Sequence, residues 1–324
     1  TPYAKRADGR GPTWNNSLFE DNAEVAFGMR SAVDKFTEFA QELANKIIAD
    51  GTEGAEVKTL LGEILNANQS TTELIEAQRT RVAKLKAGIA NSKSADAVQL
   101  LSLADYLVKK SVWALGDDGW AYDIGYGGLD HVLATGKNVN ILVLDTEVYS
   151  NTGGQSSKST PMGAIAKFAA GGKPTIKKDM GMIAMSYGYI YVAKVAMGAN
   201  QNQVVKAFME AEAYDGPSII LAYSHCIAHG INMLSGYNEQ KLAVDSGHWP
   251  LYRYNPELTA QGKNPLIVDS KDPTIQLSDY IYNENRYKML QRSNPEASKQ
   301  FLEQSQKSVS AKFKMLKQLA ALEM

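Results

Sequence analysis

The chain has 324 residues, 44% hydrophobic and 21% charged, with a formal net charge of −1. This composition is that of a soluble globular protein of one large or two ordinary domains, and the charge balance gives no reason to expect nucleic acid as a partner. No apolar run approaches the ~20 residues that a membrane-spanning helix needs. The single cysteine, Cys226, excludes a disulfide framework within the chain and indicates a reducing compartment.

The first third of the sequence favours helices. No signal peptide opens it, and the absence of an initial Met favours a processed chain or a piece of a longer one. Residues 1–16 are typical of a loop, and Ser17–Glu20 has the form of a capping box. Apolar residues at helical spacing then predict a helix to about Ile48, ended by Asp50-Gly51. Three further stretches have helical patterns: 53–66, 70–88 and 95–110. We expect the last of these to pack against the segment that follows it.

From residue 111 strands and helices alternate. Ser111–Leu115 is a short apolar run, and Asn140–Asp145 is apolar on both faces, as in a buried parallel strand. A helix at 120–134 between them completes a strand–helix–strand unit with a parallel sheet. Further elements follow: a Gly/Ser/Thr-rich loop at 150–161, helices at 178–187 and 203–214, and strands at 190–196 and 218–223. We predict an α/β fold, a doubly wound and mostly parallel sheet with helices on both faces.

The last part of the chain has a different pattern. Residues 250–276 hold four prolines and little periodicity, which predicts a segment that wraps the surface. Asn294-Pro295 resembles a helix N-cap followed by proline at the first helical position, and we expect a packing or dimer helix to Met324. The sequence therefore divides into three parts: a helical part at 1–110, an α/β core at 111–249, and a wrapping segment with a C-terminal helix at 250–324.

Two polar clusters follow predicted strands, one at Gly116–Trp120 and one at Asp145–Asn151. About one helix and one returning strand separate them, so both are expected at the sheet edge where parallel sheets bind ligands. A carboxylate (Asp118), a hydroxyl (Thr146) and a main-chain carbonyl (Val148) would leave positions of an octahedral Mg²⁺ for phosphate oxygens. A magnesium-bound diphosphate and an ordinary turn with a helix-capping aspartate both account for this pattern.

Three motifs resemble the thiamine-diphosphate domain of pyruvate:ferredoxin and pyruvate:flavodoxin oxidoreductases. They are GDDGWAYDIGYGGLDH at 116–131, LDTEVYSNTGGQ at 144–155 and YSHCIAHG at 223–230. The segments GRGPTW at 9–14 and SLFEDNAE at 17–24 also look like that family. The resemblance covers residues 9 to about 275 and implies a sheet of the thiamine-diphosphate-binding type with a helical C-terminal tail.

The resemblance implies roles for individual residues. Asp118, Thr146 and the Val148 carbonyl match ligands of Mg²⁺, and Cys226 matches one of four cysteines that hold the [4Fe-4S] cluster nearest thiamine. Asn151 matches a catalytic asparagine that faces the substrate, where its amide can stabilise negative charge on the substrate oxygen. The remaining cofactor-binding positions are those of the diphosphate-binding turn and of the loop that closes over it: Asp117, Gly119, Trp120, Glu147, Tyr149 and Ser150.

The resemblance also implies an activity, the oxidative decarboxylation of pyruvate to acetyl-CoA and CO2, with electrons passed through iron–sulfur clusters to ferredoxin or flavodoxin. It implies a homodimer, in the cytoplasm or in an anaerobic organelle such as a hydrogenosome. The other three cluster cysteines, the glutamate that activates thiamine and the residues that clamp the substrate belong to other parts of such enzymes. We therefore expect N-terminal domains of the same enzyme, or a partner subunit, to complete the site.

Alternatives stay open beside this interpretation. A non-oxidative thiamine-dependent 2-oxoacid decarboxylase is one, although Cys226 argues against it, and a non-catalytic assembly fragment is another. The usual thiamine motif begins Gly-Asp-Gly where this chain has Asp117-Asp118-Gly119, so we expect the Asp117 side chain to turn away from the diphosphate. Basic residues Lys173, Lys177 and Lys178 predict either a solvated face or a docking site for an anionic partner such as coenzyme A or an acidic electron carrier.

The chain has four histidines. His225 and His229 have a spacing that would grip zinc on a helix, but they directly follow a predicted strand, which disfavours that interpretation. His131 and His248 are most simply surface or core-edge residues, since the sequence shows no partner for either.

Overall fold

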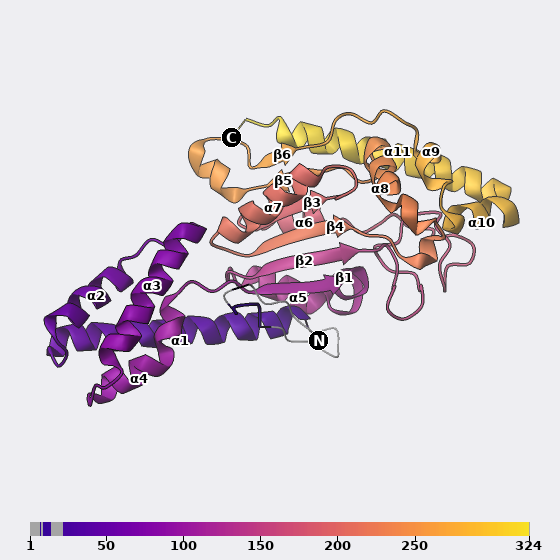
Figure 1. Ribbon diagram of the computed structural model, residues 1–324. Coiled ribbons are helices and arrows are strands. Elements are labelled where there is room, and N and C mark those ends of the chain that lie inside the picture. The colour runs from indigo at the N-terminus through magenta and orange to yellow at the C-terminus, as the bar shows by residue number, and fades with distance from the viewer. Residues whose placement is uncertain (1–6, 8, 14–21, 324) are drawn as a thin grey trace. The chain divides into compact units, whose positions relative to one another are not determined.

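The computed structural model describes residues 7, 9–13 and 22–323 (Figure 1). The predicted capping box at 17–20 lies outside these residues, as does most of the predicted loop at 1–16. Contacts divide the chain into two units, one made of Thr1–Ala26 with Trp113–Met324 and the other of Phe27–Val112.

The unit at Phe27–Val112 is helical, as predicted. Its elements are most of α1 (Asn22–Asp50), then α2 (Ala55–Leu65), α3 (Thr72–Ile89), α4 (Ala95–Leu103) and a 3-10 turn at Ala104–Leu107. Side-chain oxygens of Thr71 and Ser94 accept the Leu74 and Ala97 amides and so cap α3 and α4. All these helices contribute to one apolar cluster whose fully or nearly buried members include Leu43, Ile47, Leu61, Leu85, Leu100 and Leu107.

The stretch 95–110 packs within its own unit. Its buried residues Leu100, Leu107 and Val108 belong to the cluster formed with the preceding helices. The expected contact with the segment that follows it stays a prediction. The spacing of the apolar residues identified a buried face correctly but carried no information about which partner covers it.

The other unit contains a six-stranded sheet in the order β1-β2-β4-β3-β5-β6. The four parallel strands are β1 (Trp113–Asp117), β2 (Asn140–Asp145), β3 (Tyr191–Val195) and β4 (Ser218–Tyr223). All lie where the alternation of apolar and polar segments predicts them. The prediction of a mostly parallel α/β sheet is confirmed.

The predicted wrapping segment at 250–276 is instead partly sheet. Residues Tyr252–Tyr254 (β5) pair antiparallel with β3, and Leu266–Val268 (β6) pair antiparallel with β5. Arg253 secures this edge through ion pairs with Asp269 at 2.8 Å and Glu210 at 2.6 Å. Strands of three residues are too short to show an alternating pattern, so the prolines dominated the sequence pattern.

Helices cover both faces of this sheet, as predicted. The buried face of α7 (Gln201–Ala213) packs on Tyr191, Ala193 and Ile220. Gly181 of α6 (Met180–Met185) lies against Leu221 and Tyr252 on the other face, since adjacent strand residues point in opposite directions. The unit also contains a π-helix at Gly119–Ile124, α5 (Tyr126–Ala134), α8 (Gly236–Asp245), α9 (Leu277–Ile281), α10 (Asn285–Ser293), α11 (Pro295–Ala320) and short 3-10 turns at Ile227–His229, Met233–Ser235 and Pro256–Gln261.

The predicted cap of the last helix is confirmed: the Asn294 side chain accepts the Ala297 amide at 3.1 Å. The sequence-based interpretation did not identify α8, α9 and α10. Within the part of the chain that the structure describes, no helix combines the length and the apolar character that crossing a bilayer requires.

Candidate metal centre

The loops after β1, β2 and β4 meet at one edge of the sheet, because β2 lies between the other two strands and all three run parallel (Figure 1). The Thr146 hydroxyl oxygen lies 2.7 Å from Asp118 Oδ1 and 2.9 Å from the Val148 carbonyl oxygen. A hydroxyl has one proton and can donate to only one of these two acceptors at a time. Neighbouring oxygens around an octahedral Mg²⁺ lie about 2.9 Å apart, given ~2.0–2.1 Å bonds. The distances from the Thr146 hydroxyl to the other two predicted ligand oxygens are therefore close to those around that ion.

Asp118 carries the strongest electrostatic indication of a cation. Its side chain is fully buried, and its Oδ2 has no hydrogen-bond partner among the described residues. Burial, and then the charge of Asp145, raise the pKa of Asp118 to about 7. A buried carboxylate oxygen without a partner is costly, and a divalent cation bound to it would remove that cost. The donor set thus fits magnesium.

Glu147 fixes the backbone between two of these ligands. Its φ is +58°, in the left-handed region that side chains other than glycine rarely adopt. Its buried carboxylate accepts from Arg286 Nη2 at 2.7 Å, His248 Nε2 at 3.1 Å and Lys177 Nζ at 3.3 Å. Burial alone would raise the pKa of Glu147, but its contacts with Lys177, His248 and Arg286 hold it well below its usual range. The ion pairs hold the turn that brings Thr146 and Val148 together.

The basic residues at 173–178 do not form a solvated face. Lys173 Nζ donates to the carbonyls of Ser157 and Thr160 at 2.9 and 2.6 Å, and Lys177 Nζ lies 2.8 Å from Asp145 Oδ1. Both ammonium groups are thus used to hold the loops of this site. Lys178 donates to the Tyr122 carbonyl at 3.2 Å.

In the turn after β1, two glycines lie in close contact with aromatic rings. A Cβ on Gly119 would lie 2.5 Å from the Tyr149 ring, and one on Gly116 would lie 2.2 Å from the Trp120 ring, so neither position admits a side chain without movement. Asp117 Oδ1 accepts the Trp120 amide at 3.1 Å. The Asp117 carboxylate is therefore engaged in capping the π-helix, which is compatible with the expectation that it turns away from a diphosphate.

Main-chain hydrogen bonds close the loop after β2 and leave its tip exposed to solvent. The Tyr149 amide donates to the Gln155 carbonyl at 3.0 Å, and the Gly154 amide to the Tyr149 carbonyl at 2.7 Å. Asn151 is exposed at this tip and Ser150 is half-buried beside it. Asn151 and Ser150 thus lie in the same loop as Thr146. The catalytic role of Asn151 and the cofactor-binding role of Ser150 stay predictions.

The segment after β4 joins the same edge. Cys226 is buried, and its Sγ accepts the Ala228 amide at 3.4 Å. His229 Nε2 lies 2.6 Å from the Thr146 carbonyl oxygen. Burial, and then Arg286, lower the pKa of His229 to about 4, so the ring is neutral and donates to that carbonyl.

The histidine pair considered as a zinc site is partly assembled. His225 and His229 approach with their Nδ1 atoms 3.4 Å apart, and Glu284 lies 3.8 Å from His229. However, the Glu284 carboxylate is already engaged by Arg286 and Tyr280. The other two histidines differ from each other: His131 is exposed, whereas His248 is nearly buried against Glu147.

Sequence reasoning missed the ion-pair partners of Glu147. Arg286 and His248 come from elements more than a hundred residues beyond it, and no local motif surrounds them. The only available signal was Glu147 itself, a charged residue directly after a buried strand.

Comparison with known proteins bears on this arrangement. Residues 94–222 match the family model described as thiamine pyrophosphate enzyme, C-terminal TPP binding domain. A pyruvate-flavodoxin oxidoreductase of Nostoc sp. is 58% identical over 327 residues, which cover 99% of this chain and 27% of that protein. A pyruvate:ferredoxin oxidoreductase of Moorella thermoacetica is 50% identical over 98% of this chain and 27% of its own length. This chain is homologous to one part of those oxidoreductases.

The resemblance inferred from the motifs is thus confirmed. The chain spans about 27% of the length of these curated relatives. A solved 2-oxoglutarate:ferredoxin oxidoreductase of Magnetococcus marinus aligns with 36% of this chain and 40% of its own at 23% identity, with a TM-score of 0.33 that is too low to support an argument.

Proposed function

We propose that this chain supplies the thiamine diphosphate and magnesium half of an active site that oxidatively decarboxylates pyruvate. Coenzyme A would accept the acyl group, and ferredoxin or flavodoxin the electrons. The observation that carries the proposal is the cluster formed by Asp118 Oδ1, the Thr146 hydroxyl and the Val148 carbonyl oxygen, together with the second, buried oxygen of Asp118, which has no partner among the described residues. The names of the relatives support the choice of reaction.

Some of these residues would bind the magnesium diphosphate, and others would orient the substrate. Asp118, Thr146 and the Val148 carbonyl would hold Mg²⁺, which neutralises the diphosphate. Gly119 allows the backbone to approach it. When bound, thiamine diphosphate supplies a nucleophilic carbon that attacks the 2-oxo carbon and an electron sink for the bond that breaks. The Asn151 amide, at an exposed loop tip, would donate to the substrate oxygen as negative charge develops there.

Cys226 fits a shared cluster and not one held by this chain alone. A [4Fe-4S] cluster needs about four thiolates, and the chain has one cysteine. The proposal therefore requires three cysteines from N-terminal domains of the same enzyme or from a partner subunit, in a homodimer. A reducing compartment is needed, the cytoplasm or an anaerobic organelle such as a hydrogenosome.

Binding of the cofactor tests the central claim. Calorimetric titration of the natural protein with thiamine diphosphate and Mg²⁺ should show binding that Asp118→Asn weakens by at least ~100-fold, because the ion loses its charged ligand. Asp117→Asn is the matched control, since it keeps an acceptor for the Trp120 amide, and should change the affinity by less than about threefold. Equal affinities for the two variants would contradict the magnesium assignment.

Iron analysis separates the alternatives. The intact natural protein should contain iron and sulfide, and Cys226→Ala should remove about four irons. Binding of thiamine diphosphate without any iron or sulfide would favour a non-oxidative decarboxylase. Iron without any cofactor binding would favour an assembly role.

A further inference from the structure

The segment after β4 and the residue before α10 bring together three side chains that have no assigned role in the proposed function. They are His225, His229 and Glu284, and one possible ligand atom from each lies within 4.8 Å of the other two. His229 and Glu284 are fully buried, and His225 is half-buried. Two imidazoles and one carboxylate in such a position are a donor set that binds metal ions in proteins.

The hydrogen bonds of the two rings fix which nitrogens carry protons. His225 Nε2 lies 2.9 Å from the Gly236 carbonyl oxygen, and His229 Nε2 lies 2.6 Å from the Thr146 carbonyl oxygen. A carbonyl oxygen can only accept, so in each neutral ring the proton is on Nε2 and the lone pair is on Nδ1. Metal-binding histidines are oriented in the same way, because they donate their second ring N–H to a carbonyl or carboxylate oxygen.

The two unprotonated nitrogens lie close to each other. Nδ1 of His225 is 3.4 Å from Nδ1 of His229, and neither neutral ring has a proton left to place between them. This distance exceeds the ~2.7–3.2 Å that is typical of hydrogen bonds donated by N–H groups. Around a tetrahedral zinc ion with bonds of ~2.0–2.1 Å, two nitrogen ligands lie about 3.3–3.4 Å apart. The separation is therefore that of two ligands of one ion.

Glu284 supplies the third ligand. Its Oε1 lies 3.8 Å from His229 Nδ1, so a small turn of the carboxylate toward the ion completes the group. Tyr280 donates to Oε1 at 3.2 Å and leaves that oxygen a further lone pair, while Arg286 Nε donates to Oε2 at 2.5 Å. Ligating carboxylates are commonly hydrogen-bonded in this way. The charge of Arg286 is balanced by Glu147 at 2.7 Å.

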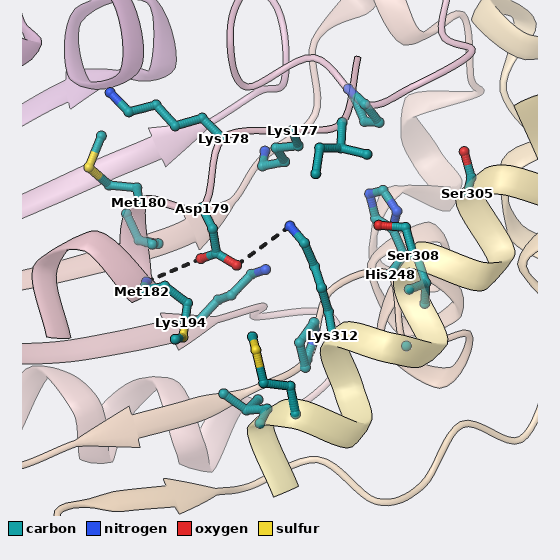
Figure 2. Close-up of a pocket in the computed structure, with 18 of the residues that line it drawn as sticks. Lys177, Lys178, Asp179, Met180, Met182, Lys194, His248, Ser305, Ser308 and Lys312 are labelled. Atoms are coloured by element: carbon teal, nitrogen blue, oxygen red, sulfur yellow. Dashed lines mark hydrogen bonds and ion pairs between the residues drawn. The ribbon is translucent and has the colours of Figure 1, made fainter. Parts of the chain in front are cut away.

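His248 shows by contrast what a metal site requires. Figure 2 shows this histidine at the wall of a cavity that Lys177, Lys194 and Lys312 also line. A divalent cation there would meet several positive charges, although His248 lies 3.1 Å from the Glu147 carboxylate. A histidine beside a carboxylate is therefore not sufficient, and a second unprotonated nitrogen close by is the distinguishing feature.

The donor set and its spacing select among ions. Mg²⁺ and Ca²⁺ prefer oxygen ligands throughout, whereas two nitrogens and one oxygen suit Zn²⁺. An octahedral ion with bonds of ~2.0–2.1 Å would hold neighbouring ligands about 2.9 Å apart, which is shorter than the 3.4 Å between the two Nδ1 atoms. The tetrahedral geometry of zinc fits this separation better.

We propose that His225, His229 and Glu284 bind one zinc ion, with a water molecule as the fourth ligand. The ion joins the segment after β4 to the start of α10. Cys226 lies between the two histidines in the sequence, so the ion fixes the chain on both sides of that residue. The site is independent of the proposed function, which assigns other side chains to magnesium and to the cluster.

Metal analysis and zinc X-ray absorption of the natural protein, purified without chelators, test this. The protein should contain about one zinc ion per chain, with nitrogen and oxygen neighbours at ~2.0–2.2 Å that include two imidazoles. Sulfur at ~2.3 Å would place the zinc at Cys226, and a shell without imidazole would place it among carboxylates; either result overturns the proposal. These measurements need no variant, so they decide the matter even if a variant fails to fold.

His225→Ala removes one ligand from the half-buried side of the site and leaves the pairing of Glu284 with Arg286 in place. Its zinc content should fall at least tenfold, since changes to residues behind metal ligands already cost ~10–100-fold in affinity. His131→Ala is the matched control, because His131 is exposed on α5, and should keep its zinc. Unchanged zinc in His225→Ala, or no zinc in the unaltered protein even after incubation with zinc sulfate, would overturn the proposal. Iron content and thiamine diphosphate affinity of the same samples report separately on the proposed function.

Discussion

At the scale of single residues, Glu147 combines two features that each cost free energy. Its backbone is left-handed and its carboxylate is buried. Both persist because Arg286, His248 and Lys177 surround the carboxylate. Strain of this kind is retained where the surrounding structure fixes it, and it often lies beside functional groups. Here the fixed turn sets the spacing of the Thr146 and Val148 oxygens.

Glu147→Gln should weaken magnesium-dependent binding of thiamine diphosphate by about 10–100-fold, the range seen when residues behind metal ligands are changed. The amide keeps the shape of the side chain but cannot balance Arg286 and Lys177, so the turn loosens. Titration at several Mg²⁺ concentrations should show that saturating Mg²⁺ restores most of the affinity. A loss that Mg²⁺ does not restore would show that Glu147 acts on the cofactor by another route.

Lys194→Met should stabilise the protein near pH 7 by about 1–3 kcal/mol, since the folded state no longer holds a partly buried charge beside the Trp249 ring. The folded-state pKa of Lys194 is lowered to about 8 from 10.5, so the unfolded chain holds more protons between these values. The free energy of unfolding of the unaltered protein therefore rises with pH there, and the advantage of the variant should vanish by about pH 10.5. Urea unfolding of both proteins at pH 7 and pH 10 measures this; a gain in stability that is equal at both pH values would contradict it.

The sequence predicted the residues of the site better than their environment. Asp118 and Thr146 follow strands at the same edge, which parallel topology requires, so their meeting was foreseeable. The partners of Glu147 were not, because Arg286 and His248 reach it through tertiary folding alone. The interpretation of Lys173 as part of a solvated face failed in the same way, since local charge does not show that this residue is buried. The alternative, a docking site for an anionic partner, stays a prediction.

At the scale of elements, the turn after β1 and the loop after β2 are packed against each other through a glycine. Gly119 touches the Tyr149 ring where any Cβ would be only 2.5 Å away. The π-helix that begins there is a local distortion of a kind that recurs at functional sites. The fit of these two segments therefore decides whether the proposed metal ligands that they carry remain together.

Gly119→Ala should displace Tyr149 and lower the affinity for thiamine diphosphate by at least tenfold, with a drop in Tm. Gly127→Ala in α5 is the control, because its Cβ would meet nothing within 4 Å. It should leave binding unchanged and raise stability by up to ~1 kcal/mol through helix propensity. Calorimetry and thermal unfolding of both variants compare them; equal behaviour would show that the contact with Tyr149 is unimportant.

Element prediction succeeded where patterns were long. The helices of the first third and the four parallel strands were found because each spans enough residues for its period to show. The elements between 236 and 293 were missed, since strands of three residues and helices of five to ten residues leave weak patterns. Arg286 lies in one of the missed helices, and His248 lies between two of the missed elements. The same weak patterns therefore explain why these elements and these two partners of Glu147 were not predicted.

At the scale of the whole molecule, the chain has two units with separate apolar cores. The helical unit has a core of its own, and all the proposed magnesium ligands lie in the other unit. Substitutions in the core of the helical unit should therefore lower the stability of that unit and leave the affinity for thiamine diphosphate nearly unchanged.

Leu85→Ala should destabilise the helical unit by about 2–5 kcal/mol, because Leu85 is fully buried in its apolar cluster. Hydrogen exchange should accelerate in residues 27–112, while the Kd for thiamine diphosphate changes by less than about threefold. Val98→Ala, at a side chain that is 55% exposed in the same unit, should change stability by less than about 0.5 kcal/mol. Loss of cofactor binding in Leu85→Ala would show that the two cores are coupled.

The hydrogen bond from His229 to the Thr146 carbonyl joins two loops whose proposed roles differ. Thr146 would hold the ion of the decarboxylation step, and Cys226, three residues before His229, would hold the first electron acceptor. A neutral, buried ring between them works as a rigid spacer whose length is set within this chain. The separation between Thr146 and Cys226 would then be set within this chain, so the proposed ion and this one proposed cluster ligand keep their relative position whatever the rest of the enzyme contributes.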